Sequence, residues 1–439
     1  MFKFIFNISK ISIYSLILKY KKINDKDLDI LHRYINDCGC FVIKIIQWIF
    51  PILEKELINK KILNVLNNVY EKNYIHDLDY TENKYKKHFN NELKNDYDII
   101  DVIASGSIGQ VYKIKCKKTG KLFAMKVKHP NVERQILLIK NMLNIIYNFK
   151  IFNNIFYNYF PFNLLEFLED FYKQTDFINE CNNLLCFYNY YKDNEYILVP
   201  KLNKSSSDII ILEYIEGTCI EDVNINDHHK SKLIYLLYLF VRNNILISNI
   251  NHGDLHKYNW KVSNEKINNM YKIIIYDFGY CFSLDEIEHS NIQNLCDLLS
   301  NLGLKNDIYK QKYSNFLKFI FNDNNIILDS NFNCKITDPD VLLDEVLKIS
   351  KKYKKTIYRF KLLNAILLLN LVDKYFKKYN INNNDNHYIV KKNILDAYTF
   401  CNTYKIFPGL EKHLLDEYKL DYKLPKQSIQ FSDKIKSLI

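Results

Sequence analysis

The chain of 439 residues has little glycine and little proline, nine and seven residues respectively. Collagen-like and low-complexity chains need far more of both, so these classes are excluded. Long apolar runs are also missing. A helix needs about 18 apolar residues to cross a bilayer, and no stretch of this chain reaches that length. The longest candidates, FVIKIIQWIFPIL and LIYLLYLFVRNNILI, are interrupted by Lys44, Gln47, Pro51 and Arg242. Neither is typical of a membrane-spanning helix.

The ten cysteines follow no metal-binding pattern, because no C-x-x-C pair occurs. Cys38 and Cys40 form one close pair, and Cys181 and Cys186 share a predicted helix. This spacing favours free thiols in a reducing compartment over a disulfide framework.

What the chain does have is typical of a globular protein: 48% apolar and 25% charged residues, with a length that allows two or three domains. Asn, Lys, Ile and 35 Tyr residues dominate. Their codons are AT-rich, so we interpret the bias as genomic. The net charge of +11 comes from lysines spread along the chain, so we expect no nucleic-acid surface and leave any protein partner undefined.

Residues 1–24 contain five lysines and no acidic residue. A mitochondrial presequence has this character, although arginine is absent here. A basic first helix fits equally well, so both alternatives stay open.

The predicted elements follow a recognisable order. Helical periodicity runs from 25 to about 94, strands are predicted at YDIIDVIA, QVYKIKC and LFAMKVK, and helices resume from about 132 to 191. Two strands follow at YILVP and DIIILEYI, and after Gly217 the chain is mostly helical, apart from a strand at KIIIYD. We therefore expect an α+β fold of the two-lobed protein-kinase type. Its expected parts are a helical extension (1–95), an N-lobe (96–216) with a helical insert (about 131–195), and a helix-rich C-lobe (217–439).

The first predicted hairpin carries the stretch ASGSIGQVY. Against the kinase loop G-x-G-x-x-G-x-V it matches at Gly106, Gly109 and Val111, with Ala104 at the first glycine position and Ser107 inside the loop. Small residues allow backbone N–H groups to approach phosphate oxygens. Two glycines in a hairpin can also be a simple turn.

The stretch FAMKVKHP places Lys126 in a strand between two apolar residues. It is either an exposed lysine or the ligand of nucleotide phosphates in kinases, which would need a carboxylate partner. Asp176 and Glu180 lie one helical turn apart in QTDFINECNNL. We assign Glu180 to Lys126, and Asp176 could equally be a surface acid.

The stretch HGDLHKYNW and the later YDFGY complete the pattern. In kinase loops an aspartate receives the proton of the nucleophile, and an asparagine five residues later holds Mg²⁺. Asp254 and Asn259 keep this spacing, and Asp277 is the second metal ligand. We interpret His252 as a loop-packing residue and His256 as a local hydrogen-bonding residue rather than a phosphate contact.

Together with LEYIEG, which contains the nucleotide-binding candidate Glu213, these motifs resemble the UbiB/ADCK family of atypical kinase-like proteins from about residue 36 to 300. That family carries a K-x-G-Q motif in an N-terminal helical extension, which folds over the active site. KIIQW occupies this place here, so the resemblance makes Lys44 and Gln47 candidate regulatory residues that face the nucleotide site. A polar stripe that faces water is the alternative.

The resemblance implies ATP and Mg²⁺ as cofactors, bound between two lobes, together with ATPase activity. It also implies an isoprenoid lipid or a membrane surface as partner and a role in ubiquinone biosynthesis. Three residues depart from the family pattern: Gly106 replaces an alanine, Ile46 replaces the glycine of K-x-G-Q, and Gln174 replaces an acid. They leave nucleotide binding in place and put the restrained catalysis of the family in question.

Two other functions fit the same residues. Aminoglycoside and choline phosphotransferases also use H-G-D-x-H-x-x-N and a D-F-G-like aspartate, although they lack S-I-G-Q-V and KHPNV. A nucleotide-gated scaffold without phosphoryl transfer is the second alternative. The expected location is mitochondrial or peripheral to a membrane for a cellular protein, and the host cytoplasm for a virus-encoded one.

Overall fold

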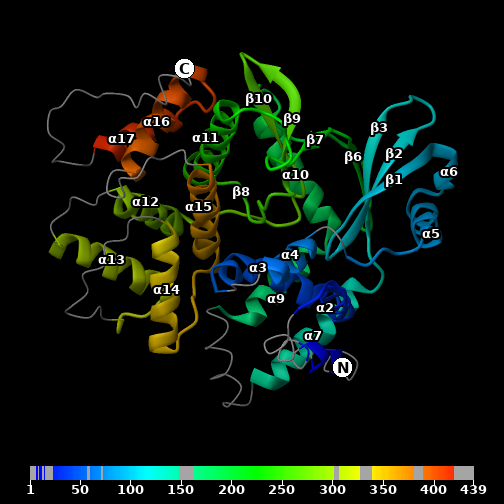
Figure 1. Cartoon of the computed structure of the whole chain (residues 1–439), viewed down its shortest axis with the longest axis horizontal. Helices are drawn as coiled ribbons and strands as arrows, with labels where there is room; N and C mark the ends of the chain where they lie inside the picture. The colour runs from blue at the N-terminus through cyan, green and yellow to red at the C-terminus, as the bar shows by residue number, and fades with distance from the viewer. Residues whose placement is uncertain are drawn as a thin grey trace. The chain divides into compact units, whose positions relative to one another are not determined.

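The computed structural model describes residues 6–7, 9–11, 14, 23–56, 60–70, 73–147, 162–300, 306–326, 339–379 and 389–419. Most of the basic segment 1–24, with its two alternatives, lies outside these residues. The chain forms two compact units (Figure 1). Unit 1 comprises Met1–Phe152, Leu164–Leu185 and Pro200–Ile215, and unit 2 comprises Asn153–Asn163, Cys186–Val199 and Glu216–Ile439.

Unit 1 begins with the predicted helical extension. Its helices are α2 (Asp25–Asp37), α3 (Cys40–Glu56), α4 (Lys60–Asn68), α5 (Leu78–Phe89) and α6 (Leu93–Asp96). A capping box starts α2, because the Asn24 side chain accepts from the Asp27 N–H and the Asp27 carboxylate accepts from the Asn24 N–H. The helices α2, α3 and α4 then bury a shared apolar cluster that includes Leu31, Ile43 and Val69.

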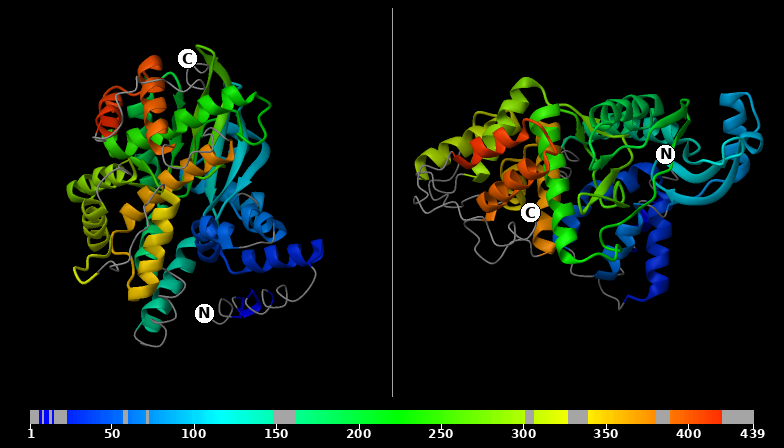
Figure 2. Two further views of the ribbon diagram at one scale, coloured as in Figure 1. Left: turned by 60° about the vertical axis from the view of Figure 1, so that its left-hand side comes forward. Right: turned by 90° about the horizontal axis from the view of Figure 1, so that it is seen from above.

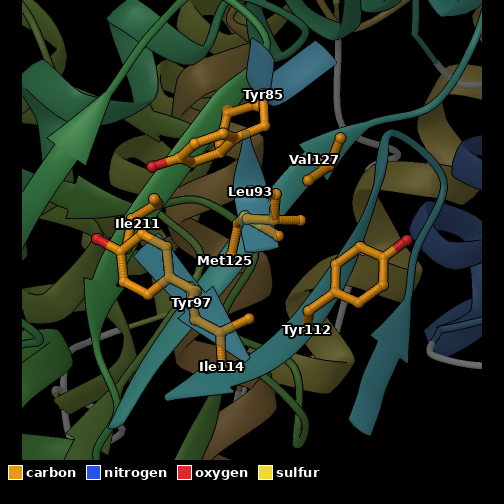
Figure 3. Packing of buried hydrophobic residues seen from close by; sticks show 9 residues of the cluster. Tyr85, Leu93, Tyr97, Tyr112, Ile114, Met125, Val127 and Ile211 are labelled. Atoms are coloured by element: carbon orange, nitrogen blue, oxygen red, sulfur yellow. The ribbon is translucent and has the colours of Figure 1, made fainter. Parts of the chain in front are cut away.

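A five-stranded sheet follows, in the order β1-β2-β3-β6-β5. Its strands are β1 (Tyr97–Ser105), β2 (Gly109–Cys116), β3 (Leu122–Lys128), β5 (Leu202–Ser205) and β6 (Ile209–Glu213). One face buries Met125, Val127 and Ile211 against Tyr85 of α5 and Leu93 beside it, as Figure 3 shows. Since side chains alternate along a strand, Lys126 must lie on the opposite face.

Three further helices belong wholly or partly to unit 1: α7 (Val132–Tyr147), α9 (Leu164–Gln174) and α10 (Phe177–Tyr191). They lie within the segment for which the sequence predicts helices. Contacts join α7 to both α3 and α9. The buried side chains of α9 include Phe167, Leu168 and Phe171, which follow the helical period along one face.

Unit 2 contains a four-stranded sheet in the order β4-β10-β9-β7 and a two-stranded pair, β8 with β11. The strands are β4 (Ile197–Leu198), β7 (Gly217–Thr218), β8 (Asn251–His252), β9 (Trp260–Ile267), β10 (Met270–Ile275) and β11 (Cys281–Phe282). Asn268 and Asn269, both with positive φ, turn the chain between β9 and β10.

The rest of unit 2 is helical: α11 (Asp227–Asn243), the π-helix η1 (Asn244–Ser248), α12 (Glu286–Ser300), α13 (Asn306–Phe321), α14 (Pro339–Tyr353), α15 (Phe360–Lys378), α16 (Ile389–Tyr404) and α17 (Leu410–Lys419). Contacts join α15 to both α11 and α14 (Figure 2). Within the described ranges, no helix combines the length and the apolar character needed to cross a membrane.

The α+β class, the kinase-like order of elements, the helical extension and the helix-rich second half are confirmed. Several strands differ from the sequence prediction. The strand predicted at YILVP is only two residues long, and it pairs parallel with β10 in unit 2 rather than with a strand of unit 1. The strands β5, β7, β8, β9 and β11 were not predicted.

Candidate functional site

The glycine-containing loop joins β1 to β2 in unit 1. Ala104 pairs with Val111 across the two strands, and the Gly106 N–H donates to the Gly109 carbonyl (3.0 Å), which closes the turn around Ser107. A Cβ atom at Gly109 would lie 2.8 Å from the Val127 carbonyl oxygen. Only glycine therefore fits at 109 without moving β3, and the hairpin keeps the close approach that a phosphate-binding loop requires.

Lys126 lies on β3 and pairs with Val111 of the loop strand. Its Nζ donates to both carboxylate oxygens of Glu180 on α10, at 2.8 and 2.9 Å. The two side chains are 15% and 6% exposed, so this is a nearly buried, bidentate charge pair. The predicted pairing is confirmed, and the alternative of an exposed, unpaired lysine is wrong.

Asp176 and Phe177 lie at the start of α10, which carries Glu180, and Glu213 lies at the end of β6, where its nucleotide-binding role stays a prediction. The Asp176 carboxylate is exposed and accepts from the Ile178 N–H at the start of α10, so Asp176 caps this helix. The Phe177 ring lies near two amines, with its centroid 5.4 Å from Lys126 Nζ and 5.2 Å from Lys128 Nζ. Glu213 ends β6, where its backbone pairs with Phe123 and its side chain is exposed.

The segment 73–76, which precedes α5, holds the loop from one side. Both the backbone N–H and the side-chain amide of Asn73 donate to the Ser105 carbonyl, at 3.0 and 3.1 Å. The Ser105 hydroxyl donates to the Tyr74 carbonyl (2.6 Å), and the His76 N–H donates to the Gln110 side chain (3.0 Å). The two ends of the loop are therefore fixed to the extension.

Lys44 and Gln47 of α3 are both buried, each only 7% exposed. The Gln47 amide donates to the Val69 carbonyl (3.0 Å), which also accepts from the Asn73 side chain (2.7 Å). A polar stripe that faces water is therefore wrong. The chain of hydrogen bonds from Gln47 leads through Asn73 to the loop, and the regulatory role of the two residues stays a prediction.

The loop HGDLHKYNW lies in unit 2 and is organised by His252, which is fully buried. Its Nε2 donates to the Tyr276 carbonyl (2.9 Å), and its Nδ1 accepts from the Asp254 N–H (3.3 Å). This pattern requires a neutral imidazole, and burial lowers the pKa of His252 below its usual value. The predicted packing role of His252 is confirmed.

Asn259 and His256 complete the frame of this loop. The Asn259 side-chain nitrogen donates to the Asp254 carbonyl (2.8 Å), and the Asn259 backbone carbonyl accepts from the Tyr276 N–H (2.8 Å). The Tyr258 N–H donates to His256 Nδ1 (3.3 Å), which confirms the local role predicted for this histidine. Because the side-chain nitrogen of Asn259 is engaged, its side-chain oxygen is the atom that could bind a cation.

Asp277 follows β10 and is exposed, with a positive φ of 55°. Aspartate tolerates this left-handed conformation better than most residues, and such backbone strain is common at functional positions. The Gly279 N–H donates to its carboxylate (3.2 Å). Asp254 and Asp277 both act electrostatically on His252, so the two carboxylates share one neighbourhood within unit 2.

The segment after Asp277 is fixed to the loop by Tyr280. The Gly253 N–H donates to the Tyr280 carbonyl (2.8 Å), and the Asn364 amide of α15 donates to the Tyr280 hydroxyl. A Cβ atom at Gly253 would collide with the Tyr280 ring. Glycine at 253 is therefore required for this packing.

The oxygen atoms of Asn259 and Asp277 are the hard donors that Mg²⁺ prefers. Within the described residues, no group of three or more His, Cys, Asp or Glu side chains could hold a metal ion by itself. A magnesium ion bound by Asn259 and Asp277 would thus need further oxygen ligands, such as those of a phosphate group or water. The residues fit a metal that arrives with a nucleotide.

Sequence reasoning did not identify Asn73, His76 or Tyr280 as parts of these sites. The contacts of His76 and Asn73 join residues more than 30 positions apart in the chain, so no local pattern signals them. Tyr280 directly follows YDFG, and this position was the only available signal.

Known proteins resemble this chain over part of its length. Residues 75–312 match the family model of the ABC1 atypical kinase-like domain. An uncharacterized aarF domain-containing protein kinase of Arabidopsis thaliana, described as chloroplastic, is 30% identical over 28% of this chain and 18% of its own length. The probable serine/threonine-protein kinase abkC of Dictyostelium discoideum is 27% identical over 50% of this chain and 32% of its own length.

This chain therefore spans less than a third of the length of each of these relatives. Among solved structures, a Mycobacterium tuberculosis protein in complex with erythromycin is 15% identical, with a TM-score of 0.43 over 68% of this chain and 82% of the other. Since the family match alone covers more than half of the sequence, the chain belongs to the ABC1 atypical kinase-like family, the UbiB/ADCK family that its motifs resemble.

Proposed function

We propose that this chain binds Mg·ATP and acts as an atypical kinase or ATPase. The observation that carries the proposal is the Lys126–Glu180 pair, at 2.8 and 2.9 Å, on the strand that pairs with the glycine-containing loop. A nearly buried ion pair is weak support for stability alone, since desolvation offsets much of its Coulomb energy. Its position next to a phosphate-type loop favours a role in nucleotide binding.

The site residues have three roles: phosphate binding, metal binding and proton transfer. The backbone of the loop from Ala104 to Val111 and the amine of Lys126 bind the phosphates, and Glu180 orients that amine. Asn259 and Asp277 hold Mg²⁺, which when bound neutralises charge on the phosphates. Asp254 accepts the proton of the attacking hydroxyl group or water.

The alternative of a small-molecule phosphotransferase is kept because that class shares the H-G-D-x-H-x-x-N loop. The scaffold alternative is kept because intact site residues do not by themselves establish turnover. The lipid partner and the mitochondrial or membrane location are proposals that follow from family membership.

One experiment separates these functions. The purified chain is assayed for Mg²⁺-dependent ATP hydrolysis alone, with anionic or zwitterionic phospholipid vesicles, and with a panel of aminoglycosides and choline. An atypical ATPase hydrolyses ATP without an acceptor, and vesicles change the rate. Acceptor-dependent turnover would favour the phosphotransferase. ATP binding without turnover in any arm would favour the scaffold, and Asp254→Asn serves as the matched inactive control.

A further inference from the structure

A pair of buried histidines lies next to the glycine-containing loop, and the proposed function does not use it. His76 comes from the segment before α5, and His129 follows β3. Their Nδ1 atoms are 2.8 Å apart, and the residues are 3% and 8% exposed. Two imidazoles at this distance must share one proton, so the pair constrains the tautomer of both rings.

The carbonyl group at one end fixes the direction of the whole chain of hydrogen bonds. His129 Nε2 lies 3.2 Å from the Gly106 carbonyl oxygen, which can only accept, so Nε2 carries the proton. In neutral His129, Nδ1 is then an acceptor, and His76 Nδ1 must donate to it. His76 Nε2 is left as an acceptor, which the Thr81 hydroxyl satisfies at 2.9 Å.

The chain ends in the core of unit 1. Thr81 Oγ1 lies 2.8 Å from the Tyr112 hydroxyl, which donates to it. Figure 3 shows the Tyr112 ring in the apolar cluster, with its hydroxyl pointing away from Met125 and Ile114. One set of tautomers thus satisfies each polar group from Tyr112 to Gly106, and the direction runs from the core to the loop.

His129 meets the loop at two further points. Its Nε2 lies 3.3 Å from the Ser105 hydroxyl, and its backbone N–H donates to the Ile108 carbonyl (2.8 Å). The carbonyls of Gly106 and Ile108 are therefore both turned toward His129. In a loop of alternating peptide groups, fixing the carbonyls on one side also fixes where the intervening N–H groups point.

Neutrality is needed for this arrangement, and burial supplies it. Desolvation lowers the pKa of His76 and of His129 to about 4. Both rings are then uncharged at neutral pH, and neither offers a positive charge to a phosphate. The pair acts on the loop through hydrogen-bond geometry alone.

We propose that His129, held in one tautomer by His76, is a positioning residue that sets the phosphate-binding conformation of the Gly106–Ile108 loop. The inference rests on the proposed function for its nucleotide readout. It goes further by assigning the loop geometry to a buried imidazole pair outside the motif itself.

The test compares His129→Ala, His76→Ala, His76→Asn and Tyr112→Phe with the parent chain. Affinity is measured for ATP and for adenosine, which has no phosphate, and amide hydrogen exchange is followed in residues 105–110 without ligand. His129→Ala should weaken ATP binding about tenfold while adenosine binding is unchanged, because one to two loop hydrogen bonds are lost. Exchange in the loop should become faster.

The other variants should differ in how much ATP affinity they lose. His76→Ala should give a smaller loss, since His129 keeps its Gly106 contact but loses its orienting donor. His76→Asn retains a donor near the Nδ1 position and should restore most of the ATP affinity. Tyr112→Phe removes only the far end, where Thr81 can still donate, and should match the parent. If His129→Ala does not fold, the contrast between His76→Ala and His76→Asn decides.

The control is His88→Ala, which removes a histidine of α5 that contacts Asp208 (3.0 Å) away from this chain of hydrogen bonds. It should leave the ratio of ATP to adenosine affinity unchanged. Equal losses for ATP and adenosine in His129→Ala, or unchanged exchange in residues 105–110, would overturn the inference. A parent chain that binds no ATP would instead overturn the proposed function, and the exchange measurement would still decide the positioning role.

Discussion

The two glycines of the phosphate-type loop should respond in opposite directions to alanine. At Gly109 a Cβ atom would lie 2.8 Å from the Val127 carbonyl oxygen and 3.4 Å from the Phe177 ring. At Gly106 the nearest atoms are the carbonyl oxygens of Gly109 at 3.8 Å and Tyr70 at 4.0 Å, which are ordinary contacts. The two positions therefore form a matched pair within one turn.

The size of the stability change at Gly109 depends on which atoms must move to make room for a Cβ atom. The Val127 carbonyl belongs to the backbone of β3, which pairs with β2 at this point, so Gly109→Ala has to separate or twist two paired strands. Overpacking of this kind costs about 1–3 kcal/mol. Gly106 has no positive φ, so Gly106→Ala should stabilise by about 0.4–1 kcal/mol through the lower entropy of the unfolded chain.

Urea unfolding followed by circular dichroism measures both variants against the parent, with the slope of the transition compared first, because a chain of two units need not unfold in one step. The expected order of midpoints, from highest to lowest, is Gly106→Ala, parent, Gly109→Ala. Equal shifts for the two variants, or a larger loss at 106, would refute the steric argument. A lower slope for one variant would mean either that it no longer unfolds in one step or that its denatured state is more compact, and its midpoint would then not be compared with that of the parent.

Three further predictions concern the ion pair, the metal and pH. Lys126→Ala and Glu180→Ala should each reduce ATP affinity. Removing one partner of a buried charge pair typically costs about 3–5 kcal/mol, because the other charge stays buried without its partner. Strict additivity of the two losses in the double variant would mean that the residues are not coupled. Asp277→Asn should weaken binding of Mg·ATP more than binding of metal-free ATP in thermal-shift titrations, and equal weakening would contradict the metal role. The pKa values of His76 and His129 are lowered to about 4 in the folded chain, so the unfolded chain binds more protons below about pH 6.5. The free energy of unfolding should therefore fall from about pH 6.5 toward pH 4, by at most about 3 kcal/mol for each imidazole. A His76→Asn variant whose stability changes with pH as steeply as that of the parent would contradict this.

Much of the first unit could be predicted because its signals are local. The alternation of FAMKVK places Lys126 opposite Met125 and Val127, and the one-turn spacing in QTDFINE gives a helix face with Glu180 on it. In the second unit, the packing role of His252 likewise followed from its position before Asp254. In each case a short pattern and a simple period were sufficient.

What could not be predicted depends on distant parts of the chain or on a signal hidden by composition. The parallel pairing of Ile197 with Ile273 joins strands 76 residues apart. Asn268 and Asn269 make a hairpin turn with two positive φ values, a known use of asparagine. In a chain this rich in asparagine, however, the pair does not stand out. The His76–His129 contact likewise has no local pattern.

The packing of Tyr280 on Gly253 has a consequence for how this protein can be switched. Its backbone and ring are bound to the loop that carries Asp254, and its hydroxyl is bound to Asn364 of α15. The segment with Asp277 and the loop with Asp254 are therefore coupled through Tyr280, so that moving one disturbs the contacts of the other. An off-state made by swinging Asp277 away would first have to break these contacts. A switch that leaves these contacts intact would have to move the loop with Asp254 and the segment with Asp277 together.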